Sequence, residues 1–228
     1  MNEWIQKFHQ NFIEGDRFLF LLKGLGNTLI IAAFAVLLGI VLGFLVAIIR
    51  ASYDREGKFK FLNAICKIYI TVIRGTPVLV QLLILYYIIM SSMNNKILTA
   101  VLAFGLNSAA YVSEIMRSGI MSIDVGQFEA GRSLGLSYSA VMRHIILPQA
   151  VKNVLPALAN EFIVLLKETS VSGYIGLMDL TRGGDIIRST TYEAILPLLA
   201  VAAIYLVIVM CLSYAVGVLE RRLRTSER

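Results

Sequence analysis

The chain has 228 residues, of which 57% are hydrophobic and 16% are charged, with 21 Lys and Arg against 15 Asp and Glu. Soluble domains usually carry about 45–50% apolar and about 25% charged residues, so this composition excludes an ordinary water-soluble globule. It also excludes a disordered chain, which would be polar and highly charged. Because a membrane-spanning helix needs about 20 mostly apolar residues, the chain can supply roughly five of them.

Residues 1–20 do not read as a secretory signal, because acidic residues interrupt them and no apolar core follows a basic start. The apolar side chains of this segment recur at helical spacing: Trp4, Ile5, Phe8 and Phe12. Such a pattern predicts an amphipathic helix at the membrane interface. An ordinary surface helix or a frayed terminus is the open alternative.

Five largely apolar stretches follow, at about residues 25–49, 61–90, 97–115, 148–166 and 194–219. The first contains Gly39 and Gly43, a pair of small residues of the kind that lets helices approach closely in lipid. The second is interrupted by Gly75-Thr76-Pro77. Proline removes a backbone donor and pushes the preceding residue to an extended conformation, so we expect a kink at 74–77.

The basic residues predict how the spans are oriented. The loop at 50–60, the connection at 116–152 and the tail after residue 219 share one side of a five-span chain, and they carry most of the Lys and Arg. The positive-inside rule places that side in the cytoplasm, with the N-terminus outside and the C-terminus inside. This bias accounts for the net charge of +6, so we expect no nucleic-acid partner.

Polar side chains inside the third span predict a face turned to the bundle interior. Asn107, Tyr111 and Glu114 share one helical face there, and Gln81 lies in the second span. For Asn107, Tyr111 and Gln81, a substrate contact and an interhelical hydrogen bond both remain open. For Glu114 an ion pair with Arg117 is the better interpretation.

Glu161 is the leading candidate for a substrate contact. It lies deep in the fourth span, where an ionisable side chain costs about 2.5–3.5 kcal/mol at the centre of a helix. We expect its carboxylate to pair with an amino group or a cationic side chain of the substrate. A structural ion pair with Lys152 or Lys167 is the alternative.

Residues 129–148 read EAGRSLGLSYSAVMRHIILP, which resembles the cytoplasmic signature of ATP-binding cassette importer permeases. The positions that match the family's spacing are Glu129, Ala130, Gly135, Ile145, Leu147 and Pro148. Gly131 departs from it, since the family usually has Ala there. Four other stretches resemble the polar amino acid uptake subfamily of these permeases. They are Arg74-Gly75-Thr76-Pro77 with Gln81, and residues 24–29, 110–120 and 165–170.

This resemblance implies an all-α membrane protein, with five transmembrane helices of the type I importer permease core and cytoplasmic coupling helices. Residues 1–20 would form the extracellular or interfacial N-terminal helix, residues 21–219 the permease domain with its coupling segment at about 124–148, and residues 220–228 a cytoplasmic tail. The location implied is a bacterial cytoplasmic membrane.

The resemblance also implies the partners. The coupling segment would dock on an ATP-binding cassette ATPase, through Glu129, Ala130, Gly131, Gly135, Ile145, Leu147 and Pro148. An extracellular binding protein would deliver the amino acid, and two permeases, expected to be identical, would pair around the pathway. The chain has no GxxxxGK[ST] loop, so ATP and Mg would be bound by the partner ATPase, and no cofactor or enzyme activity is expected in this chain.

Two other classes of membrane protein fit the sequence less well. A membrane enzyme would need a catalytic pair, and an ion-coupled carrier usually has more spans and internal repeats; neither feature appears. No cluster of residues has metal-ligand spacing. Glu161 favours arginine, histidine or lysine as the substrate, while glutamine and cystine remain open.

Overall fold

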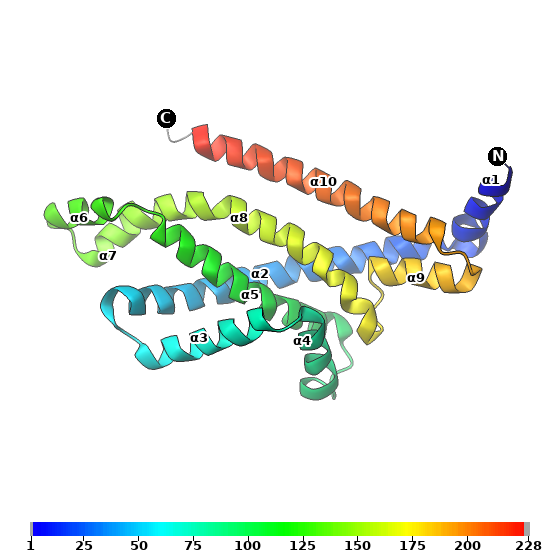
Figure 1. The fold of residues 1–228 in the computed structure, drawn as a ribbon, viewed down its shortest axis with the longest axis horizontal. Coiled ribbons are helices and arrows are strands. Elements are labelled where there is room, and N and C mark those ends of the chain that lie inside the picture. The colour runs from blue at the N-terminus through cyan, green and yellow to red at the C-terminus, as the bar shows by residue number, and fades with distance from the viewer. Residues whose placement is uncertain (1, 226–228) are drawn as a thin grey trace.

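The computed structural model describes residues 2–225, and these residues are helical with no β-strand. Their long helices run side by side along the length of the molecule (Figure 1). The α-helices are α1 (Asn2–Phe8), α2 (Phe18–Glu56), α3 (Lys60–Gly75), α4 (Val78–Ile84), α5 (Lys96–Met121), α6 (Val125–Ser133), α7 (Tyr138–Val141), α8 (Leu147–Glu168), α9 (Leu180–Thr191) and α10 (Ile195–Thr225). Shorter π-helical or 3-10 turns are η1 (His9–Ile13), η2 (Glu14–Asp16), η3 (Leu85–Ile89), η4 (Met142–Ile146) and η5 (Thr169–Ile175). The all-α fold is confirmed.

Length and hydropathy identify three described helical segments that can each cross a membrane: Phe18–Asp54, Lys96–Met121 and Ile195–Leu223. A fourth crossing is possible if the bent pair α3 and α4–η3 counts as one span. The remaining predicted span, at about 148–166, corresponds to α8, which has 22 residues. It is long enough to cross, but polar residues such as Lys152, Asn153 and Glu161 lower its hydropathy.

The kink predicted at 74–77 is confirmed, because the helices on either side of it meet at 109°. Pro77 lacks the N–H that the carbonyl of Ile73 would accept from in a continuous helix. The side-chain amide of Gln81 takes its place, donating to Ile73 O at 2.7 Å and to Thr76 O at 3.0 Å. Gln81, which follows the break in the sequence, therefore stabilises it by bonding to carbonyl groups that precede it.

The two ends of the bundle differ in what they carry (Figure 1). One end holds α6 and α7, with the C-terminal part of α10 directed toward it, and the other holds the N-terminus, α1 and α9. We call these the α6–α7 end and the α1–α9 end. The first and last described residues, 2 and 225, thus lie toward opposite ends, as an odd number of crossings requires. The assignment of the α6–α7 end to the cytoplasm stays a prediction.

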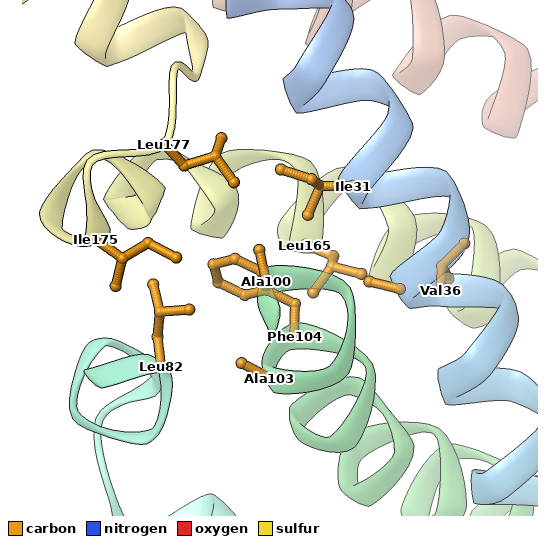
Figure 2. Close-up of a cluster of buried hydrophobic side chains, with 10 residues drawn as sticks. Ile31, Val36, Leu82, Ala100, Ala103, Phe104, Leu165, Ile175 and Leu177 are labelled. Carbon is orange, nitrogen blue, oxygen red and sulfur yellow. The ribbon is translucent and has the colours of Figure 1, made fainter. Parts of the chain in front are cut away.

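The main core lies where α2, α4, α5, α8 and η5 meet (Figure 2). Phe104 of α5 is fully buried there, among the labelled side chains Leu82, Leu165, Ile175 and Leu177. The small residues predicted to allow close approach do so on α2. A Cβ at Gly39 would lie 2.7 Å from Ser108 Oγ, and one at Gly43 would lie 2.8 Å from the carbonyl oxygen of Ala109.

The start of α2 holds the loop that precedes α9. The side-chain amide of Asn27 donates to Met178 O at 2.7 Å, and the hydroxyl of Thr28 accepts from Leu180 N at 3.1 Å. A Cβ on Gly24 would overlap the backbone carbonyl of Asp179, 2.7 Å from its carbon. The stretch Gly24–Thr28 is therefore shaped to receive residues 178–180, and we call this contact the α2–loop contact.

The face predicted for the N-terminal helix is partly wrong. Trp4, Ile5 and Phe8 are exposed as expected, but Phe12 is buried and Ile13 is exposed in its place. The cause is η1, a π-helical turn that contains one more residue per turn than an α-helix would. Ile13 consequently occupies the position on the surface that Phe12 would hold in a regular helix.

Candidate functional site

The polar face of α5 lies against the broken pair α3–α4. Asn107 is buried, and its side-chain amide donates to Gln81 Oε1 at 3.0 Å. The next residue on that face, Tyr111, has the guanidinium carbon of Arg74 5.2 Å from its ring centroid. The structure thus brings Gln81, Asn107 and Tyr111 together. In this state Asn107 and Gln81 make the interhelical hydrogen bond that the sequence left open.

Glu114 completes this face with a cluster of arginines. It forms ion pairs with Arg50 of α2, with Arg74 at 4.0 Å and with Arg117 at 3.3 Å. The predicted pairing of Glu114 with Arg117 is therefore confirmed, and two further arginines join it. Because one carboxylate faces three guanidinium groups, the cluster keeps an excess of positive charge.

Glu161 lies on α8 and faces the contact of α2 with α5. Its side chain is mostly buried, and Oε1 accepts a hydrogen bond from the hydroxyl of Ser108 at 3.0 Å. Ser108 in turn packs against the bare backbone of Gly39. No ion pair found among residues 2–225 includes Glu161, so the structure does not show the alternative pairing with Lys152 or Lys167.

Gln81 of α4 and Glu161 of α8 bond to neighbouring residues of α5, Asn107 and Ser108, on different faces of that helix. Ser108 follows Asn107 in sequence, so the two side chains leave α5 about 100° apart around the helix. The candidate substrate contacts therefore lie along two neighbouring faces of α5. Asn160, the residue before Glu161, is exposed.

The coupling segment is a compact pair of short helices with capped ends. Asp124 caps α6 by accepting from Gly126 N at 2.7 Å, and Ser137 caps α7 by accepting from Ala140 N at 3.3 Å. Between them Gly135 has φ +82, a conformation that glycine adopts without the strain of a side chain. The segment thus has fixed joints rather than a flexible loop.

Gly131 is the point of closest packing between α6 and the following turn. It is buried, and a Cβ there would lie 2.8 Å from Val141 Cγ2 and 3.0 Å from Ile145 Cδ1. Beneath it Ile146 is fully buried in an apolar cluster with Val141 and Ala150. Ile145 and Leu147 pack against this cluster and are half-buried.

The outward face of the segment is available for a partner. Glu129, Ala130, Gly135 and Pro148 are exposed. Leu134, between α6 and α7, is 83% exposed. A cavity of about 540 Å³ lies beside α6, lined in part by Met121, Phe128 and Arg132.

Sequence reasoning missed a buried acid at the α1–α9 end. Asp179 is fully buried; its Oδ2 accepts from Thr181 N at 3.0 Å, while Oδ1 has no hydrogen-bond partner. Burial raises the pKa of Asp179 to about 6, although the backbone hydrogen bond from Thr181 opposes that rise. The only signal in the sequence was an acidic residue just before a helix, a common N-cap.

Two other partners also escaped the sequence. Ser108, which bonds to Glu161, lies in a run of small residues that reads simply as close packing. Arg50, which pairs with Glu114, follows an uncharged span and reads as a loop residue. Among residues 2–225, no group of three or more His, Cys, Asp or Glu is placed to hold a metal ion.

Comparison with protein families gives one match that covers most of the chain. Residues 36–225 match the model of the binding-protein-dependent transport system inner membrane component. This range contains the candidate contacts on α4, α5 and α8 as well as the coupling segment. It begins within α2, after the α2–loop contact.

Individual relatives extend the similarity over nearly the whole chain. The arginine transport system permease protein ArtQ of Bacillus subtilis is 38% identical over 91% of this chain and 94% of its own length. The glutamine transport system permease protein GlnP of Escherichia coli K12 is 36% identical over 90% and 93%. A crystal structure described as an amino acid ABC transporter with histidines shares 44% identity, with a TM-score of 0.83 over 89% of this chain and 94% of that one.

Proposed function

Since the chain belongs to the family of binding-protein-dependent transport system inner membrane components, and is a permease of the polar amino acid ABC type, we propose that its substrate is a cationic amino acid. Arginine, histidine and lysine are the members of this class. Uptake would be driven by ATP hydrolysis in a separate ATPase subunit that docks on the coupling segment. This chain would supply the pathway and no catalytic group.

The observation that carries the choice of substrate is the environment of Glu161. Its carboxylate is mostly buried between α2, α5 and α8, and a neutral hydroxyl, that of Ser108, is the hydrogen-bond partner seen. A buried carboxylate without a cationic partner is costly. The side-chain guanidinium, imidazolium or ammonium group of a cationic amino acid would remove that cost, which supports this class of substrate if the α-ammonium group binds elsewhere. The relative ArtQ, named for arginine transport, agrees with this choice.

Glutamine and cystine remain the competing substrates. The relative GlnP is named for glutamine transport, and the amide of glutamine could hydrogen-bond to Glu161 without a charge. Gln81, Asn107 and Tyr111 offer the polar groups for the uncharged part of either kind of substrate. In this proposal Asn107 and Gln81 exchange their hydrogen bond to each other for bonds to the amino acid.

The test of the substrate class is Glu161→Gln, with Ser108→Ala as the matched control, in the complex reconstituted with its ATPase and binding protein. Losing a charge-assisted hydrogen bond of about 1.5–3 kcal/mol should lower arginine uptake at least about tenfold. Ser108→Ala removes the neighbour and keeps the charge, so it should retain arginine uptake. Unchanged arginine uptake in Glu161→Gln would rule out the role assigned to Glu161.

Docking of the ATPase rests on the exposed face of α6 and the turn after it. Glu129 and Ala130 are exposed there, while Gly131 keeps the two short helices in contact. Replacing Leu134 with Asp should weaken co-purification of the ATPase, because it places a charge on an exposed apolar contact. The control is Leu22→Asn on α2, which is also exposed but lies toward the α1–α9 end. Equal recovery of the ATPase with both variants would contradict this docking site.

Pairing with a second, identical permease is proposed as part of the same complex. The support is the exposed apolar side of α3, which includes Ile65, Ile68 and Val72. A cysteine at position 68, in a chain whose Cys66 and Cys211 are replaced by Ser, should form a covalent dimer with a short cross-linker. The proposed topology, with the N-terminus outside, can be checked with membrane-impermeant thiol labelling of single cysteines at positions 3 and 226.

A further inference from the structure

The N-terminal segment presents a patch of large apolar side chains outside the bundle. Trp4, Ile5, Phe8 and Ile13 are between 48% and 61% exposed. Trp4, Ile5 and Phe8 fall within one arc of α1, and the π-helical turn η1 brings Ile13 to the same side. We call these four residues the N-terminal patch.

The patch is fixed to the bundle and is not a frayed end. Asn11 is fully buried; its amide donates to Lys7 O at 2.8 Å, and its oxygen accepts from Thr191 Oγ1 at 2.7 Å. Phe12 is buried in an apolar cluster that includes Leu21 and Ile187. Asn11 and Phe12 therefore anchor the segment to α2 and α9, with the patch on the other side.

A sharp turn sets the direction of the segment. Gly15 and Asp16 both have positive φ, +64 and +52, and the side chain of Arg17 donates to Gln10 O across the turn. As a result α1 runs across the direction of α2 in Figure 1. Since α2 is long and apolar enough to cross a membrane, α1 would lie across the membrane normal rather than along it.

The patch adjoins a surface that lipid must cover. Directly after the turn, α2 begins with exposed apolar residues, among them Phe18, Leu19 and Leu22. The ring of Phe8, in the patch, lies 5.0 Å from that of Phe12, which packs on Leu21 of α2. One sharp turn therefore separates the patch from the exposed apolar start of α2, the helix that is long and apolar enough to cross a membrane.

The charges of the segment indicate how it would bind. Between residues 2 and 13 the formally charged side chains, with the exposed His9 counted as neutral, are Glu3 and Lys7, which pair at 3.0 Å. Lys7 Nζ also lies 5.9 Å from the centroid of the Trp4 ring. With no excess of basic residues, binding depends on apolar burial, and Trp is the side chain most suited to the boundary between headgroups and acyl chains.

We propose that residues 4–13 lie in the lipid–water interface at the α1–α9 end, with Trp4, Ile5, Phe8 and Ile13 inserted into the boundary of headgroups and acyl chains. An amphipathic segment of this kind inserts its apolar face by about 5–10 Å. The segment thereby holds the start of α2 at a fixed depth in the bilayer. This inference is independent of the substrate and of the docking of the ATPase.

Trp4 is the chain's single tryptophan, so its own fluorescence tests the proposal. The full chain is reconstituted into phosphatidylcholine vesicles whose acyl chains carry bromine either near the headgroup or near the bilayer centre. Two reference chains carry Trp4→Phe with Phe34→Trp in the middle of α2, or with Leu134→Trp at the α6–α7 end. Both reference positions are exposed, at 58% and 83%.

Trp4 should lose more fluorescence to the shallow bromine than to the deep one, while position 34 shows the reverse order and position 134 loses little to either. The loss at Trp4 should be the same in neutral and in anionic vesicles, since no excess of charge is involved. Quenching of Trp4 by iodide but not by brominated lipid would overturn the proposal. So would a Trp4 emission that responds to added binding protein or to the density of the chain, because either result identifies a protein as the occupant.

Discussion

The amide of Asn107 on α5 donates a hydrogen bond to the side-chain oxygen of Gln81 on α4. The side-chain nitrogen of Gln81 in turn donates to the backbone carbonyl of Ile73 in α3. One glutamine thus joins three helices at the point where Pro77 interrupts the second span. Its position makes Gln81 more important for the fold than its sequence context suggests.

Replacing Gln81 with Ala should destabilise the chain by about 2–3 kcal/mol, because the Ile73 carbonyl and the buried Asn107 amide both lose their partner. Asn107→Ala should cost less, about 1 kcal/mol, since Gln81 keeps its backbone bonds. The double variant should cost less than the sum of the two. Thermal unfolding in detergent measures all three, with the exposed Gln127→Ala as control. Additive losses would contradict a shared hydrogen bond.

Gly24→Ala should destabilise the chain by about 1–3 kcal/mol, because the new Cβ overlaps the carbonyl of Asp179 in the α2–loop contact. Gly26→Ala is the matched control two residues away. No atom outside the helix lies within 4 Å of a Cβ at position 26, so alanine there should stabilise the helix by about 0.5–1 kcal/mol. Unfolding midpoints that shift in the same direction for both variants would contradict the contact.

Asp179 should make the stability of the chain depend on pH between 4 and 6. Its pKa in the folded state is about 6, against about 3.9 when unfolded. In this window the folded chain binds a proton that the unfolded chain releases, so stability rises as the pH falls and is lost as the pH rises through 6. The free energy of unfolding should be about 1 kcal/mol higher at pH 5 than at pH 7.5.

Asp179→Asn should remove that difference, because an amide does not titrate and its oxygen can still accept from Thr181 N. Asp185→Asn is the control. Arg188 lowers the pKa of Asp185 by hydrogen bonding, so this carboxyl stays ionised at both pH values and its stabilisation is lost only in more acidic solution. A pH dependence that survives in Asp179→Asn would assign it to another group.

Glu114→Gln should destabilise the chain by about 1–3 kcal/mol, a value reduced from that of a fully buried pair because Glu114 is 21% exposed. The reason is that Arg50 and Arg117, both mostly buried, lose their shared counter-charge. The exposed pair of Glu3 with Lys7 supplies the control, and Glu3→Gln should leave the unfolding midpoint unchanged. Equal shifts of the unfolding midpoint in Glu114→Gln and Glu3→Gln would show that the arginine cluster is solvated.

Gly131→Ala should be tolerated, and Gly131→Leu should not. A Cβ would lie 2.8 Å from Cγ2 of the buried, β-branched Val141 and 3.0 Å from Ile145 Cδ1, so alanine requires only a small shift of these side chains and displaces no backbone. A leucine side chain would push α6 away from α7 and should lower the ATPase activity of the assembled complex severalfold. The combination Gly131→Ala with Val141→Ala should behave as the wild type. Full ATPase activity in Gly131→Leu would contradict close packing as the role of this glycine.

Much of this fold could be predicted because its signals are local. Long apolar runs and the Gly75-Thr76-Pro77 break each depend on a few adjacent residues, and the bend of 109° follows from a missing N–H. The polar face of α5 was also visible as a spacing of three and four residues. The π-helical turn at residues 9–13 was not, since nothing in its composition marks the extra residue that exposes Ile13.

The partners of the candidate site were harder to predict, because they come from distant parts of the chain. Ser108 bonds to Glu161 across 53 positions, and Arg50 pairs with Glu114 across 64. Spacing within one helix shows which way a side chain points but not which helix lies opposite. The sequence offered Lys152 or Lys167 as the alternative, structural partners of Glu161, since charge is easier to recognise than a hydroxyl in a row of small residues.

The α2–loop contact also constrains how the protein is made. Asn27 and Met178 are 151 positions apart, so a ribosome adding about 5–20 residues per second finishes the loop about 8–30 s after the start of α2. During that interval Asn27 and Thr28 enter the membrane without their final partners. The first helix to be inserted is therefore among the last to be completed, and truncation before residue 180 should leave it incompletely assembled and open to quality-control proteolysis.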